Sequence, residues 1–196
     1  MEHTTPDPAA FLHVRIIIGV VTGLAIARVL TGLAHFAQAP ERRRAYGVHI
    51  AWSLVLLLMI VHFWWFEFSL AHVSHWTFET YAFVIFYAAL YFFTAAILFP
   101  ERLDGYADFA AYFHDRRPWF FGALIALLAV DLVDTALKGM DHFRSLGIAY
   151  PIRHGVLILL ALIAIPIGDR RYHIAFVALA LVTQVWWIAV RYNILD

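Results

Sequence analysis

Residues 120–138 read FFGALIALLAVDLVDTALK, an apolar stretch that contains two acidic side chains, Asp131 and Asp134. A helix of about 20 apolar residues crosses the hydrocarbon core of a bilayer, which is about 30 Å thick. Carboxylates three residues apart share one face of a helix. A charge in hydrocarbon is costly, so both side chains are expected to face a protein interior or a water-filled cavity. The rest of the chain must supply that environment.

The whole chain has the composition of a membrane protein. Of its 196 residues, 63% are hydrophobic and 14% are charged, and the mean hydropathy is +0.76. Soluble domains are about half apolar and about a quarter charged. We therefore expect the lipid bilayer as a partner, and the net charge of zero gives no reason to expect nucleic acid. The chain has no cysteine, which excludes disulfides, thiolate metal sites and cysteine nucleophiles.

Six apolar segments predict an all-α fold, an integral membrane bundle of about six transmembrane helices that forms one domain over residues 1–196. The predicted spans are approximately residues 9–36, 48–68, 78–99, 119–138, 151–167 and 173–192, of which the fifth is the shortest. Between the third and fourth spans, residues 104–115 place aromatic side chains on one side and charged ones on the other. This pattern predicts an amphipathic helix that lies in the membrane interface.

The arginines predict the orientation of the chain. The turns after the first, third and fifth spans contain Arg42, Arg43, Arg44, Arg102, Arg116, Arg117, Arg170 and Arg171. The opposite side has only Lys138, Arg144 and Arg153. By the positive-inside rule, the arginine-rich turns are cytoplasmic and both termini lie outside the cytoplasm. Short, arginine-rich loops are typical of a multi-pass protein of the plasma (bacterial inner) membrane.

The acidic pair predicts a polar pocket. His62, on an outward-running helix, is expected to reach the depth of Asp131. If the second and fourth spans are neighbours, these side chains form a pocket that opens outward, with Glu67 and His154 nearer its mouth. Titratable groups in one pocket perturb each other's protonation, which suits proton relay or cation coordination. The candidate relay residues are Asp131, Asp134, His62, Glu67 and His154. The pathway wall is predicted to be a stripe of hydroxyls on the third span, Thr80, Tyr87, Tyr91 and Thr94.

A structural interpretation of the same residues stays open. Asp134 and Lys138 are four residues apart and so are placed to form an ion pair. Asp131 is placed to neutralise one of the arginines Arg15, Arg28 or Arg191. His62 is equally consistent with a histidine that is hydrogen-bonded between two helices.

Two further groups of residues are candidates for contacts at the ends and outer faces of the bundle. On the cytoplasmic side, Arg28, His35, His49 and Ser53 suit either binding of a lipid head group or an anion, or simple anchoring of helix ends. Small residues recur at every fourth position of the first span, at Gly19, Gly23, Ala27 and Thr31. Such a seam allows close helix packing, within the chain, in a homo-oligomer or in a larger membrane complex.

Three functions remain open. The first is a transporter or channel that conducts protons or cations, or couples to them, through the Asp/His pocket. The second is an integral-membrane redox subunit or a subunit that binds lipid, quinone or pigment, which the 17 phenylalanines, nine tyrosines and seven tryptophans favour weakly. The third is a structural subunit of a larger membrane complex.

Cofactors and catalysis have little support in the sequence. The pocket has donor atoms for a divalent metal, but HExxH and ExxH spacings are absent, so the metal is unknown. Haem ligation would require two facing buried histidines, and only His62 is predicted to be deep. No cofactor is strongly implied. GxSxG turns and serine–lysine pairs are absent from the spans, so we do not favour an enzyme.

Overall fold

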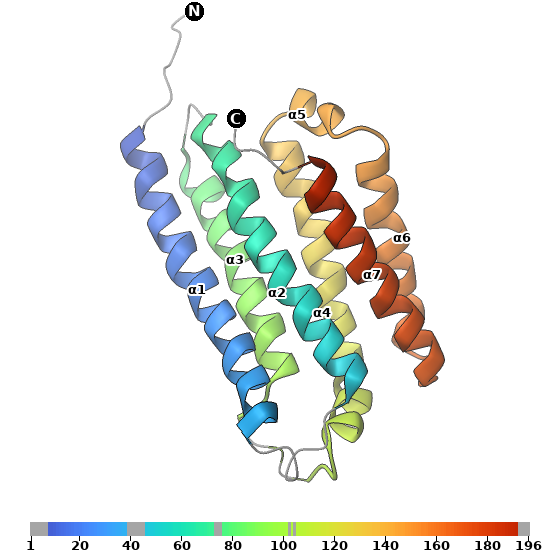
Figure 1. Cartoon of the computed structure of the whole chain (residues 1–196). Helices are drawn as coiled ribbons and strands as arrows, with labels where there is room; N and C mark the ends of the chain where they lie inside the picture. Colours follow the sequence, from blue (N-terminus) through green and yellow to red (C-terminus); the bar gives the residue numbers. More distant parts are fainter. Residues whose placement is uncertain (1–7, 39–45, 73–75, 102, 104, 192–196) are drawn as a thin grey trace, which may run out of the picture.

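The computed structural model describes residues 8–38, 46–72, 76–101, 103 and 105–191, and every element in these ranges is helical. The elements are α1 (Pro8–Gln38), α2 (Gly47–Phe66), the 3-10 helix η1 (Glu67–His72), α3 (Phe78–Leu98), α4 (Phe109–Leu137), α5 (Met140–Ser145), α6 (Ala149–Ala164) and α7 (Arg170–Arg191). The long helices lie side by side in one bundle, and α5 lies at one end of it (Figure 1).

Five helical segments are long and apolar enough to cross a membrane. They are Phe11–Phe36, Gly47–Ala71, Phe78–Leu98, Phe109–Leu137 and Arg170–Val190. Helix α6 is apolar but has only 16 residues, which gives a length of about 24 Å against a hydrocarbon core of about 30 Å. The predicted all-helical fold is therefore confirmed, and five of its helices have the length and composition of membrane spans, while the sixth crossing stays a prediction.

The predicted interfacial helix over residues 104–115 is not present as a separate element. The helix α4 begins at Phe109 and continues through Pro118 into the predicted fourth span. Asp108 caps its start by accepting a hydrogen bond from the backbone N–H of Ala111 at 2.9 Å. The first turns of α4 do have an apolar face, but this face packs against the bundle. Phe109 and Phe113 are buried, and the ring of Phe109 lies 4.6 Å from that of Phe36.

The helices form two rows that enclose a common core. In one row α4 lies between α3 and α6, and in the other α2 lies between α1 and α7. Contacts of α1 with α3 and of α6 with α7 join the rows at their edges (Figure 1). The second half of α4, which carries both aspartates, therefore packs between α3 and α6 on its inner side, while Val133 and Leu137 stay exposed on its outer side.

The predicted seam of small residues packs within the chain at only one position. A Cβ atom added at Gly19 would lie 2.5 Å from the ring of Trp64, whereas one added at Gly23 would meet nothing within 4 Å. Ala27 and Thr31 are exposed. A tighter contact of α1 occurs at Gly32, where an added Cβ would lie 2.2 Å from the ring of Phe99, the residue that follows α3. Contact of the exposed seam with a second copy or a larger complex stays a prediction.

The two glycines Gly32 and Gly23 provide a matched pair of substitutions. We expect Gly32→Ala to destabilise the protein relative to Gly23→Ala by about 1–3 kcal/mol, because the new methyl group overlaps the Phe99 ring. Both substitutions gain the same helix propensity, about 1 kcal/mol. The difference in stability between the two variants therefore measures the cost of the overlap with the Phe99 ring. Thermal unfolding of the two variants in detergent measures it, and equal melting temperatures would contradict the close contact.

Candidate functional site

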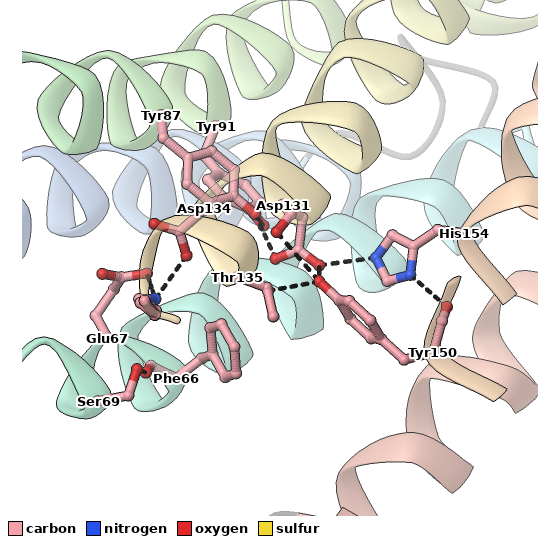
Figure 2. A network of polar contacts seen from close by, with 11 residues as sticks. Phe66, Glu67, Ser69, Tyr87, Tyr91, Asp131, Asp134, Thr135, Tyr150 and His154 are labelled. Carbon is pink, nitrogen blue, oxygen red and sulfur yellow. Dashed lines mark hydrogen bonds and ion pairs between the residues drawn. The ribbon is translucent and has the colours of Figure 1, made fainter. Parts of the chain in front are cut away.

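The carboxylate of Asp131 in α4, whose side chain is 24% exposed, receives side chains from two other helices, α3 and α6. Its Oδ1 accepts a hydrogen bond from the hydroxyl of Tyr87 in α3 at 2.8 Å. Its Oδ2 accepts one from the hydroxyl of Tyr150 in α6 at 2.7 Å and lies 2.7 Å from Nε2 of His154. Figure 2 shows these side chains converging on Asp131. Helices α3, α4 and α6 are thus joined at one polar point.

The contacts of His154 determine how many protons the pair holds. Nδ1 of His154 lies 2.9 Å from the backbone carbonyl oxygen of Tyr150, and a carbonyl only accepts, so Nδ1 carries a hydrogen. Nε2 faces Oδ2 of Asp131, and that contact also requires one hydrogen between the two atoms. Whether the hydrogen is placed on the imidazole or on the carboxyl, the pair is neutral and holds one exchangeable proton.

Hydroxyl groups extend this network on both sides. The hydroxyl of Tyr150 lies 2.7 Å from that of Thr135, and also donates toward the backbone oxygen of Asp131 at 3.1 Å. The hydroxyl of Tyr87 lies 3.3 Å from that of Tyr91. Since Tyr87 donates to Asp131, Tyr91 is the donor in this second contact. The buried hydroxyls therefore form a continuous hydrogen-bonded chain to the carboxylate.

A small cavity lies against the pair. It leaves about 20 Å³ for the centres of water molecules, which is room for one or two waters. His62 from α2 lines the same cavity as Asp131, and so do Gln184 from α7 and Arg153 from α6. The side-chain oxygen of Gln184 accepts from Arg153, so its amide nitrogen is the donor to Nδ1 of His62 at 3.4 Å. The cavity therefore has a proton-bearing pair on one wall and an imidazole on another.

Asp134 and Glu67 belong to a separate ion-pair cluster. The ammonium of Lys138 lies 2.6 Å from Oδ2 of Asp134 and 2.8 Å from Oε1 of Glu67, and 4.1 Å from the centre of the Phe66 ring. The side chains of Lys138, Asp134 and Glu67 are at most 4% exposed. The Asp134–Lys138 pair, one of the structural alternatives, is thus present, and Figure 2 shows Glu67 and Asp134 apart from His154.

The other structural alternative proposed an arginine for Asp131. Asp131 contacts Tyr87, Tyr150 and His154 instead of Arg15 or Arg28. The side chain of Arg191 lies outside the described residues.

The predicted pathway wall reaches the site at two of its four positions. Tyr87 and Tyr91 line the cavity. Thr94 donates to the carbonyl of Leu90 in its own helix at 2.7 Å, and Thr80 lies in the first turn of α3, where its backbone N–H is capped by Thr77. A helical face that runs the length of α3 therefore contacts several different environments.

The predicted cytoplasmic-side group does not become one polar site. The ring of His49 lies among phenylalanines, with centroid distances of 5.0 Å to Phe109 and 5.1 Å to Phe99. Within the described residues, both of its ring nitrogens lack a hydrogen-bond partner. Ser53 donates to the carbonyl of His49 in its own helix at 2.8 Å. Neither residue therefore presents its side chain to Arg28 or His35.

Four residues of the site were missed in the sequence, Tyr150, Arg153, Gln184 and Thr135. Tyr150 is four residues from His154 and shares its helical face, but it lies just before Pro151, at which the predicted fifth span began. Gln184 is a polar side chain within the apolar last span, the same kind of signal that singled out Asp131.

The fold and the site together define an all-helical protein with five membrane-length helices and an Asp–His–Tyr network between α3, α4 and α6. Comparison with protein-family models, with curated proteins and with solved structures finds no match. Among the described residues, groups of three or more His, Asp or Glu side chains suited to a metal ion are absent. The geometry of the site is therefore the basis for a functional proposal.

Proposed function

We propose that this protein conducts protons, or couples their movement to transport, through the Asp131–His154 pair. The observation that carries the proposal is the position of His154 between two oxygen acceptors, the carbonyl of Tyr150 and the carboxylate of Asp131. The pair holds one proton in this arrangement. Loss of the proton would leave a nitrogen lone pair and a carboxylate oxygen facing each other at 2.7 Å, so release requires the two side chains to separate.

The cavity gives the released proton a next acceptor. The pair and His62 line this cavity together, so a water bound in it would connect them. A neutral imidazole whose Nδ1 accepts carries its hydrogen on Nε2, so His62 takes a further proton only on Nδ1. That step breaks its contact with Gln184 and loosens α2 from α7. Proton transfer and helix contact are coupled in this scheme.

The size of the cavity favours protons over larger ligands. Space for one or two waters is far too small for a quinone or a pigment, the alternative that the aromatic content left open. Proton transfer needs only hydrogen-bonded groups and water. The cavity also lies among the groups that bind the proton, so no additional opening is required for the transfer to His62.

The arginine distribution supports an orientation for this scheme. The ends of α3 and α6 and the starts of α4 and α7 lie at the same end of the bundle (Figure 1). Arg116, Arg117, Arg170 and Arg171 belong to this end. We propose that it faces the cytoplasm of a bacterial inner membrane, with both termini outside. The proton-binding pair then lies in the half of the bundle nearer the outside.

Proton flux through reconstituted protein tests the proposed function. We expect liposomes that contain the wild type and a pH-sensitive dye to acidify when a pH gradient is imposed under clamped voltage. We expect Asp131→Asn to reduce the flux to that of protein-free liposomes, because its amide cannot exchange the proton. Asp141→Asn, at a fully exposed side chain, is the matched control and should keep the wild-type rate. Wild-type flux in Asp131→Asn, or no flux in the wild type, would contradict the proposal.

A further inference from the structure

The ion-pair cluster has an unequal number of charges. Lys138 lies between Glu67 and Asp134, and the three side chains are almost completely buried. With both carboxyl groups ionised, the cluster would carry one net negative charge inside an apolar bundle. An uncompensated buried charge is very costly. A further cation, either a proton on one carboxyl group or a bound ion, would make the cluster itself neutral.

The contacts of Glu67 identify it as the group that binds this cation. Its Oε1 accepts a hydrogen bond from Lys138 at 2.8 Å. Its Oε2 is buried and has no hydrogen-bond partner among the described residues. A charged oxygen without a donor is the least favourable position in the cluster for a negative charge. A proton on Oε2 removes that charge.

A second small cavity, between α1 and the α2–η1 segment, gives Glu67 access to water. It leaves about 10 Å³ for water centres, room for about one water, and Glu67 lines it together with Arg15 and Trp64. The guanidinium of Arg15 lies 4.0 Å from the centre of the Phe68 ring. A metal cation would need several more oxygen ligands than this cluster and about one water provide, so the further cation that suits Glu67 is a proton on Oε2.

We propose that Glu67 is a second proton-binding site of the protein and that Arg15 is its counter-charge. The O–H bond at Oε2 breaks, the proton passes to water in the cavity, and the guanidinium of Arg15 compensates the carboxylate that remains. Lys138 and Asp134 in α4 lie beside Glu67, and Arg15 in α1 lines the same cavity. Asp131 and Tyr91 interact with it electrostatically from further away. This inference does not depend on the Asp131–His154 pair.

Infrared difference spectroscopy of the full chain in liposomes tests the assignment without altering the fold. We expect the C=O band of a protonated carboxyl group that disappears as the pH rises. The band should shift when the protein contains glutamate labelled with ¹³C at its side-chain carboxyl carbon. Glu79 and Glu101 are exposed, so among the described glutamates Glu67 is the source of a buried band. If glutamate labelling shifts no protonated-carboxyl band, the proposal is wrong.

Removal of Arg15 tests its role as the counter-charge. We expect Glu67 to keep its proton to higher pH in Arg15→Gln, because a positive charge that favours the carboxylate has been removed. Arg144→Gln, at a side chain that is 73% exposed in α5, is the control and should leave the titration unchanged. An unchanged titration in Arg15→Gln would overturn the pairing. The C=O band of a protonated Asp131 would shift with labelled aspartate and not with labelled glutamate. The experiment therefore distinguishes failure of the Glu67 site from failure of the proposed function.

Discussion

Replacement of Lys138 by methionine is expected to destabilise the protein by about 3–5 kcal/mol, the range seen when one partner of a buried ion pair is removed. Methionine keeps most of the side-chain volume but leaves Glu67 and Asp134 buried without their ammonium group. The loss of purified, monodisperse protein on heating in detergent measures the effect. Arg144→Met is the control, because Arg144 forms an exposed ion pair with Asp141. This variant should have a melting temperature close to that of the wild type.

The same cluster permits a rescue experiment. The triple variant Lys138→Met, Glu67→Gln, Asp134→Asn has no charge in the cluster, so we expect it to recover most of the lost stability. Neutral amides still require hydrogen bonds, and for that reason we expect recovery to be incomplete. A Lys138→Met protein as stable as the wild type, or a triple variant no more stable than the single one, would show that the three side chains do not act as a unit.

The all-helical fold with its long apolar helices was largely predictable because the length of an apolar segment is a property of the sequence itself. The interfacial helix at residues 104–115 was not predictable from periodicity. An amphipathic segment has the same pattern whether its apolar face contacts lipid or protein, and here Phe113 contacts Tyr46 and Phe121 within the bundle. Pro118 then suggested a helix boundary, although α4 continues through it.

The sequence pointed to several residues of the candidate site, but it did not show which of them lie together. Asp131 and Asp134 were expected in one pocket because they share a helical face. Positions three apart nevertheless differ in direction by about 60°, so Asp131 meets α3 and α6 whereas Asp134 meets Lys138 and Glu67. Which helices become neighbours depends on contacts far apart in the sequence, and a single sequence does not contain that information.

His154 was expected at the mouth of the pocket because it lies near the start of its span. In the structure α6 begins at Ala149, so His154 lies in the second turn of this helix. The short connection through α5 places that turn beside Asp131. A position near the end of a helix in sequence is therefore compatible with a central position in the network.

Substitutions of Asp131 separate its role in the fold from its role in proton binding. We expect Asp131→Leu to cost several kcal/mol, because the hydroxyl of Tyr87 and Nε2 of His154 lose their partner and each unsatisfied buried group costs about 1–3 kcal/mol. Asp131→Asn should cost much less. Its amide oxygen accepts from Tyr87, its amide nitrogen donates to a neutral His154, and Tyr150 keeps the backbone oxygen of residue 131 as an acceptor.

Thermal melts of the two variants beside Asp141→Leu measure this difference, and Asp141→Leu should behave as the wild type because its side chain is exposed. Neutralising Arg28 should rescue neither variant, since Arg28 is not a partner of Asp131 in the described contacts. If Asp131→Asn melted as early as Asp131→Leu, the negative charge itself would be required for folding. A folded Asp131→Asn protein without proton flux would instead show that the fold needs the hydrogen bonds of this side chain and that the activity needs its proton.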